Sequence, residues 1–255
     1  MRRRASDLWP PALALLALVA GWAGSVRLLD VSERIVPSPS LVARSTWADR
    51  QNLWPAVATT AREAVLGMLL AVVVAVLLAV LLDVSPRLRR ALYPLLVASQ
   101  TLPIVALAPL VLIWFGFGQR PKIVLVALFT FFAVTVGLVQ GMAATDPDVM
   151  RLARTIGAGR WRVLLRVRLP GGLPGCFTGL RVSVTYAVVS ATVAEFVGAE
   201  QGLGVYMTVA RNAFRTDLVF GAVIVTALLT LVRFGLVVIL ERGAMPWRPP
   251  PRRRR

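Results

Sequence analysis

Glu195 lies near the end of a long apolar run, residues 176–198, where an acidic side chain needs a physical reason. An ionised group in hydrocarbon is costly, so such residues usually face a cavity, a substrate pathway or one another. Glu195 is therefore a candidate for contacting a transported solute. The alternative is structural, an ion pair with Arg181 of the same run or with Arg233 of the last apolar run.

Gln100 and Thr101 stand just before Pro103 in another apolar run, residues 91–115. Prolines at membrane depth can open the backbone, and the freed polar groups are tolerated where they line a cavity. Tyr186 could reach a ring-shaped solute with its phenol. These three residues join Glu195 as candidates for a substrate pathway. The alternatives are a proline-kinked helix in a packed bundle and a hydroxyl held between helices.

The sequence lacks the residues that most enzymatic and metal chemistry requires. It has no histidine and one cysteine, Cys176, which excludes an internal disulfide, a Cys/His zinc site and a histidine-based catalytic triad. It also has no Gly-x-x-x-x-Gly-Lys-Ser/Thr loop for binding ATP. We therefore expect no catalytic residue, no metal site and no cofactor in this chain.

Composition places the chain in a membrane. Of its 255 residues 57% are hydrophobic, with a mean hydropathy of +0.73, against about 45–50% apolar residues in soluble domains. The net charge of +17 does not indicate nucleic-acid binding, because the basic residues fall between apolar runs. We expect an all-α polytopic membrane protein with a single transmembrane domain over residues 1–245. Six runs fit a membrane-spanning helix of about 20 residues: 8–26, 56–82, 91–115, 123–141, 176–198 and 217–240.

The distribution of Lys and Arg between the runs predicts the orientation. If both termini are cytoplasmic, 18 of these residues lie inside and 9, including Lys122, lie outside. This agrees with the positive-inside rule and places both termini and the loop 146–170 in the cytoplasm. The first run also fits a signal peptide, because Met1–Arg4 supplies a basic start. Both interpretations give the rest of the chain the same orientation.

Two segments lie outside the six apolar runs and are expected to lie outside the membrane as well. The tail PWRPPPRRRR, residues 246–255, is expected to be a disordered, basic cytoplasmic tail attracted to anionic lipid. The connector 27–55 is expected outside the membrane, with a short amphipathic helix around 41–53.

The stretch RLARTIGAGRWRVLLRVRLP, residues 151–170, holds six arginines. Each would cost about 2.5–3.5 kcal/mol at the centre of a membrane helix, so the stretch lies outside the bilayer. Asp146-Pro147 predicts a helix start, and Gly157 predicts its end. A second short helix follows Gly159 and is expected to close at Leu169-Pro170. Such a hairpin either rests on lipid or offers a helix to a groove on a cytoplasmic partner. The first helix carries an apolar stripe of Val149, Leu152, Ala153 and Ile156.

The order of residues in this stretch resembles the cytoplasmic loop of permease subunits of binding-protein-dependent ABC importers. That signature is Glu-Ala-Ala, three residues, Gly, nine residues, then Ile-x-Leu-Pro. Here Gly157 is followed after nine residues by Val167, Arg168, Leu169 and Pro170. WFGFG at 114–118, AEFVG at 194–198 and GLG at 202–204 also resemble the sulfonate, nitrate and taurine family. SQTLPIVALAPL, residues 99–110, is more similar to permeases for pyrimidine thiamine precursors or riboflavin.

The resemblance implies a complex of two permease copies, two cytoplasmic ATPases that use the ATP, and an external solute-binding protein. The loop 146–170 would then couple ATP hydrolysis in the ATPases to transport. Arg151 departs from the signature, because the family has a glutamate there. The contact with the ATPase is then expected to rest on Gly157, Ala158 and the apolar stripe, or on an altered partner surface. The coupling residues implied are Arg151, Ala153, Arg154, Gly157, Ala158, Trp161, Val167, Leu169 and Pro170.

Two other classes of membrane protein fit less well. An ion-coupled secondary transporter usually shows repeated halves with an ion site near the midplane, and no repeat is visible in the sequence. An intramembrane enzyme needs a nucleophile with its base or a metal site, for which Glu195 and Cys176 are a poor set. The sequence therefore favours a permease subunit that moves a small organic solute through the cell membrane.

Overall fold

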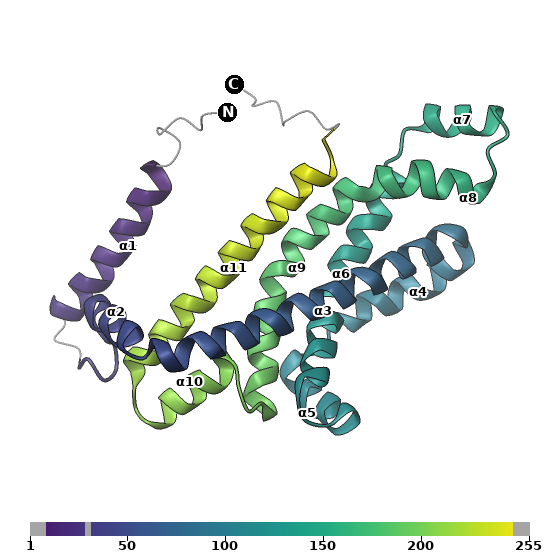
Figure 1. Ribbon diagram of the computed structural model, residues 1–255. Helices are drawn as coiled ribbons and strands as arrows, with labels where there is room; N and C mark the ends of the chain where they lie inside the picture. Colours follow the sequence, from purple (N-terminus) through teal and green to yellow (C-terminus); the bar gives the residue numbers. More distant parts are fainter. Residues whose placement is uncertain (1–8, 29–31, 247–255) are drawn as a thin grey trace.

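The computed structural model describes residues 9–28 and 32–246, and these ranges form helices joined by turns, with no strand (Figure 1). This confirms the predicted all-α membrane architecture. The elements are α1 (Trp9–Leu28), α2 (Pro39–Ala48), α3 (Arg50–Val84), α4 (Pro86–Ser99), α5 (Ile104–Phe115), α6 (Gln119–Ala143), α7 (Pro147–Thr155), α8 (Arg160–Val163), the π-helical turn η2 (Leu164–Arg168), α9 (Leu169–Gly198), α10 (Leu203–Asn212) and α11 (Thr216–Ala244).

Four continuous helical stretches are long and apolar enough to cross a membrane: 50–84, 119–143, 160–198 and 216–244. They contain four of the six predicted runs, and each is longer than its run. The first predicted run, 8–26, coincides with α1, whose apolar part Ala12–Leu28 is shorter than the others. The predicted tail 246–255 lies outside the described residues except for Pro246.

The predicted run 91–115 is not one straight helix. α4 and α5 meet at an angle of 104° across a break of four residues. Pro103 explains the break, because it lacks an N–H and pushes the preceding residue, Leu102, out of the helical region. The polypeptide therefore starts a new helix at Ile104. α4 and α5 together make a bent span or a re-entrant segment.

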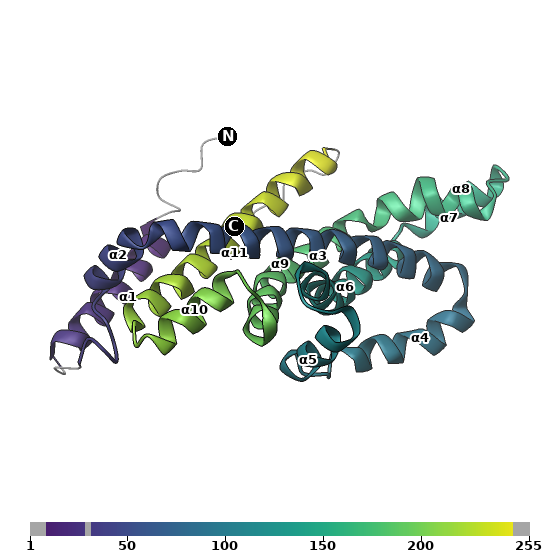
Figure 2. The same ribbon diagram turned by 60° about the horizontal axis from the view of Figure 1, so that its bottom comes forward.

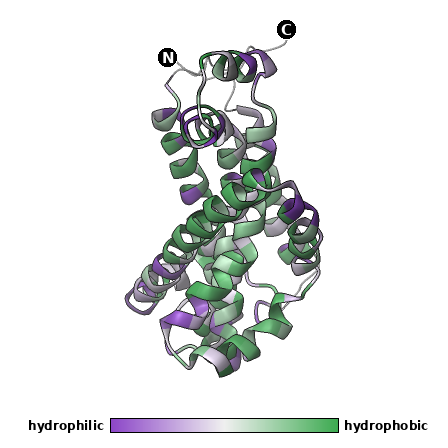
Figure 3. Ribbon diagram, turned by 90° about the vertical axis from the view of Figure 1, so that its right-hand side faces the viewer, coloured by the Kyte–Doolittle hydropathy of each residue, from purple (hydrophilic) through white to green (hydrophobic). Residues whose placement is uncertain are grey.

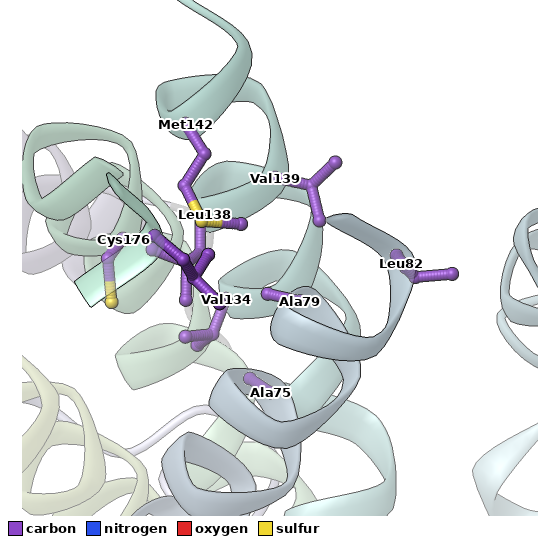
Figure 4. Packing of buried hydrophobic residues seen from close by; sticks show 9 residues of the cluster. Ala75, Ala79, Leu82, Val134, Leu138, Val139, Met142 and Cys176 are labelled. Atoms are coloured by element: carbon purple, nitrogen blue, oxygen red, sulfur yellow. The ribbon is translucent and has the colours of Figure 1, made fainter. Parts of the chain in front are cut away.

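The core of the bundle is the packing of α3, α6 and α9. α6 and α9 approach so closely at Gly137 and Gly175 that a side chain on either residue would overlap the backbone of the other helix. Glycine is required there because it alone brings no Cβ. Next to this contact, Cys176 behaves as a small apolar residue. It packs in a buried cluster with Ala75, Ala79, Leu82, Val134, Leu138, Val139, Met142 and Leu164 (Figure 4).

The two ends of the bundle carry different short helices. α7 and α8 project past the ends of α6 and α9, while α2 and α10 lie at the opposite end (Figures 1 and 2). The amphipathic helix expected around 41–53 is present as α2, capped by Ser38, and α3 begins directly after it. The long sides of the bundle are predominantly apolar (Figure 3). Leu16 of α1 and Leu231 of α11, for example, are 69% and 65% exposed, which suits a lipid environment.

Candidate functional site

The arginine-rich stretch forms a helical hairpin at the end of the bundle. Asp146 stands before the first residue of α7, and its Oδ1 accepts a hydrogen bond from Asp148 N at 2.8 Å. Gly157 follows the helix with a φ of +69°, and the next residue, Ala158, donates its N–H to Ala153 O at 2.9 Å. A left-handed residue with this returning bond terminates a helix. Both predicted boundaries of the first helix are therefore confirmed.

The predicted end of the second helix at Leu169-Pro170 is wrong. α8, η2 and α9 follow one another without a break, so the helix that starts at Arg160 continues to Gly198. At η2 Leu169 donates its N–H to Leu164 O, five residues back. A proline inside a regular α-helix clashes with the carbonyl four residues before it, and the wider π-turn makes room for Pro170. The short helix α8 and the spanning helix α9 are therefore parts of one continuous helical segment.

Arg151, the residue that departs from the family signature, is accessible at the surface of α7. Its guanidinium lies 3.2 Å from Asp148 of the same helix, and the two side chains are 80% and 83% exposed. An ion pair with this exposure stabilises a protein by at most about 1 kcal/mol. The Arg151 side chain can therefore exchange this contact for one with another protein.

The apolar stripe predicted on the first helix of the hairpin, α7, is buried in one part and exposed in another. Ala153 is buried, whereas Leu152 and Ile156 are 62% and 72% exposed, and Trp161 of α8 is 63% exposed. An exposed apolar patch outside the spanning part of a membrane protein marks a contact with another protein or with lipid. Ala158, Val167, Leu169 and Pro170 are half-buried, and the Arg154 side chain lies outside the described part of the chain.

The base of the hairpin is tied to α3. The Arg168 guanidinium lies 2.6 Å from Asp83 Oδ1, and both side chains are partly buried. Arg168 occupies the x position of the family signature, one residue before Leu169. Asp83 is at the end of the apolar run of α3, where the sequence alone gave no reason to select it.

Glu195 lies at the opposite end of the bundle and is 1% exposed. Its Oε1 accepts a hydrogen bond from the Thr60 hydroxyl of α3 at 2.6 Å, and its Oε2 accepts one from Gly204 N at 2.6 Å. Thr60 Oγ1 in turn accepts a hydrogen bond from Leu203 N at 2.9 Å. The first amides of a helix have no partner within the helix, and Glu195 and Thr60 supply partners for two amides of α10. The two residues thus join α3, α9 and α10.

Gly202 makes this arrangement possible. Its φ is +135°, and a Cβ there would overlap the Glu195 carboxylate. Only glycine combines this backbone conformation with an empty side-chain position. The GLG sequence at 202–204 therefore serves to bring the start of α10 onto Glu195.

The ion pair predicted between Glu195 and Arg181 or Arg233 is wrong. Arg181 instead pairs with Glu241 of α11. Arg233 is 7% exposed, and its Nη1 has no hydrogen-bond partner among the described residues. Arg181 and Glu195 lie on the same helix α9, about 21 Å apart along its axis, so they cannot pair. Arg233 lies on α11, and whether it reaches Glu195 depends on how far α9 and α11 are displaced along each other, which periodicity does not define.

A second buried pair was missed in the sequence. Lys122 Nζ of α6 lies 2.6 Å from Glu63 Oε1 of α3, and the residues are 4% and 0% exposed. In the sequence Lys122 falls in an external loop between two apolar runs, and Glu63 follows Arg62 in the apolar run 56–82, so no local pattern connects Glu63 with Lys122. The spacing of three residues between Glu63 and Thr60, which places both on one helix face, is the signal that could have selected Glu63.

The other candidates for a substrate pathway, Gln100, Thr101 and Tyr186, do not lie beside Glu195 in the structure. Gln100 and Thr101 are exposed at the break between α4 and α5. Tyr186 is 55% exposed on α9, and it lies nine residues before Glu195, about 13 Å along the helix. Their contact with a solute stays a prediction.

Residues 67–245 match the family model of the inner membrane component of binding-protein-dependent transport systems. The chain belongs to this permease family. The permease is 34% identical over 247 residues to the formylaminopyrimidine transport permease protein ThiX of Halalkalibacterium halodurans, covering 96% of this chain and 98% of ThiX. It is 37% identical over 244 residues to the riboflavin transport system permease protein RibX of Chloroflexus aurantiacus, covering 94% and 91%.

The permease is also 31% identical over 241 residues to the taurine transport system permease protein TauC of Escherichia coli, covering 91% of this chain and 87% of TauC. Its fold is similar to a chain of an inward-facing MetNI methionine ABC transporter, with a TM-score of 0.61 and 19% identity over 78% of this chain and 96% of that one. The permease is therefore a transport subunit of an ABC importer and not an enzyme, as the sequence predicted.

Proposed function

We propose that the permease forms the membrane path for a small, planar nitrogen heterocycle, a pyrimidine or a flavin. The similarity to ThiX and RibX supports this class, because it extends over nearly the whole of all three chains. A sulfonate is the second candidate, supported by the similarity to TauC. Gln100 and Thr101 at the helix break and the exposed Tyr186 of α9 are the side chains available to bind such a solute.

The proposed orientation has both termini and the α7–α8 hairpin in the cytoplasm. The excess of Lys and Arg on that side supports it. α2 and α10 then face the outside, where a solute-binding protein delivers the solute. The proposed assembly contains two permease copies and two ATPase subunits, which bind the ATP, and the permease itself carries no cofactor.

The α7–α8 hairpin is proposed as the coupling element of this assembly. Its exposed apolar residues Leu152, Ile156 and Trp161 provide the surface for an ATPase groove, beside the accessible Arg151. Because α8 continues through η2 into α9, and Arg168 ties the same region to Asp83 of α3, a push on the hairpin reaches two spanning helices at once. This continuity is the observation that carries the proposal.

The coupling role is tested by two glycines of the hairpin. Gly157 has a φ of +69° and Gly159 has a φ of −64°, and a Cβ at either residue meets no atom within 4 Å. Valine at 157 is strained in the left-handed region, whereas valine at 159 fits its backbone. We expect Gly157→Val to lower the solute-stimulated ATPase activity of the reconstituted complex severalfold. The ATPase activity with Gly159→Val should stay much closer to the wild-type value. Normal stimulation in Gly157→Val would contradict the coupling role.

The substrate class requires a separate measurement. The solute-binding protein encoded with the permease is purified without added ligand, and its bound small molecule is identified by mass spectrometry. A pyrimidine or flavin supports the proposal, and a sulfonate overturns it in favour of the second candidate.

A further inference from the structure

Three ionisable side chains meet inside the bundle near α10, and their charges do not balance. Glu63, Lys122 and Glu195 are 0%, 4% and 1% exposed. Glu63 Oε1 lies 2.6 Å from Lys122 Nζ. Glu195 accepts a hydrogen bond from Thr60, which lies three residues before Glu63 on the same face of α3. The charges of Glu63 and Glu195 therefore act on each other. Two carboxylates and one ammonium would leave a net negative charge in a site that excludes water. Such an uncompensated charge is strongly destabilising.

The oxygen atoms of the two glutamates are unequally satisfied. Both Glu195 oxygens have hydrogen-bond partners, Thr60 and Gly204, and Glu63 Oε1 has Lys122. Glu63 Oε2 is enclosed and has no hydrogen-bond partner among the described residues. Burying an ionised oxygen without a hydrogen-bond donor destabilises the folded protein by about 1–3 kcal/mol or more. A protonated oxygen avoids this cost because it can donate a hydrogen bond itself.

We propose that Glu63 and Glu195 hold one exchangeable proton between them, which makes their cluster with Lys122 electrically neutral. Two carboxyl groups that lie in the same enclosed site retain a proton because both cannot ionise without repulsion. The proton comes from bulk water and returns to it, so no other reactant is needed.

Thr60 is compatible with either position of this proton. Its hydroxyl lies 2.6 Å from Glu195 Oε1 and 3.2 Å from Ala56 O. When Glu195 is ionised, Thr60 donates to it. When Glu195 is protonated, it donates to Thr60, and Thr60 then donates to Ala56 O. Leu203 N keeps its bond to Thr60 Oγ1 in both cases.

The proton controls the attachment of α10. The cations that act on the pair are Lys122 of α6 and the exposed Arg62 of α3, and α10 contributes the N–H groups of Leu203 and Gly204. Loss of the proton leaves two carboxylates in one enclosed site with a single ammonium. Their repulsion separates α9 from α3 at the position where both hold α10.

The test compares thermal unfolding of the purified permease in lipid nanodiscs at mildly acidic and mildly alkaline pH. The wild-type melting temperature should fall as the pH rises, because the alkaline state carries the second negative charge. Glu63→Gln and Glu195→Gln each leave one carboxylate for Lys122, so the fall should largely disappear in both. The control Glu200→Gln, at an exposed glutamate between α9 and α10, should keep the wild-type fall. Equal falls in all four proteins would overturn the proposal.

Infrared spectroscopy provides an independent measurement that does not depend on how the variants fold. The wild type and Glu200→Gln should show the carbonyl stretch of a protonated carboxyl group at neutral pH, and it should disappear on alkaline titration. A wild-type spectrum without this band at neutral pH would overturn the proposal, whatever the variants show.

Discussion

The Thr60 hydroxyl of α3 donates a hydrogen bond to Glu195 Oε1 of α9 at 2.6 Å, although 135 residues separate the two in the sequence. Through Leu203 N and Gly204 N the same two side chains hold the first turn of α10. The fold of one end of the permease therefore depends on a hydroxyl and a carboxyl group that belong to different spanning helices.

Thr60→Val should destabilise the folded permease because valine keeps the shape and removes the hydroxyl. A buried carboxyl oxygen and a buried amide each lose a partner, at a cost of about 1–3 kcal/mol for each group. Thr59→Val is the matched control, since the Thr59 hydroxyl donates to Pro55 O within its own helix and makes no bond to another helix among the described residues. Denaturant unfolding in detergent should show a clearly lower free energy of unfolding for Thr60→Val. For Thr59→Val the free energy of unfolding should change by no more than about 0.5 kcal/mol. Equal losses would show that the link between α3 and α9 contributes nothing specific.

Gly202→Ala should be among the most damaging single methyl additions to the permease. The new Cβ would overlap the Glu195 carboxylate in a backbone conformation with a φ of +135°. Gly235→Ala in α11 is the opposite case, because a Cβ there meets no atom within 4 Å and alanine favours a helix over glycine by about 1 kcal/mol. In thermal unfolding, the melting temperature of Gly202→Ala should lie well below that of the wild type, and the melting temperature of Gly235→Ala should equal or exceed it. A harmless Gly202→Ala would contradict the described turn.

Asp83→Asn should weaken the connection between the hairpin and α3. It leaves the partly buried Arg168 without its carboxylate, which costs more than the loss of an exposed pair. Asp148→Asn removes the exposed partner of Arg151 and serves as the control. We expect solute-stimulated ATPase activity of the reconstituted complex to fall in Asp83→Asn and to change little in Asp148→Asn. The opposite order would assign coupling to the Arg151 pair.

Tyr206 should titrate at unusually high pH. Its phenol donates a hydrogen bond to Asp49 Oδ2 at 2.6 Å, and burial together with this carboxylate raises the pKa of Tyr206. Because the pKa is raised on folding, the stabilisation is complete below the unfolded value of about 10 and is lost as the pH rises above it. The wild type should therefore lose stability above this pH more steeply than Tyr206→Phe. Ultraviolet titration of tyrosinate should show one late-ionising phenol that Tyr206→Phe removes, and its absence from the wild type would refute the assignment.

Local sequence was sufficient for four of the six predicted spans, the first helix of the hairpin and the family. Apolar runs, the Asp146-Pro147 start and Gly157 act over a few residues, so their structure follows from backbone and side-chain chemistry close by in the chain. The local rule failed at Pro170, where the π-turn of η2 allows the helix to continue past a proline.

Tertiary structure alone decided which polar groups meet. The sequence showed that Glu195, Arg181 and Arg233 lie in apolar runs, but the distance that one helix slides along another determines their partners. That displacement is determined by packing, as at Gly137 and Gly175, where two backbones come into contact. Glu195 therefore met Thr60 and the start of α10, Arg181 met Glu241, and Glu63 met Lys122, each across a helix contact that no local pattern of residues specifies.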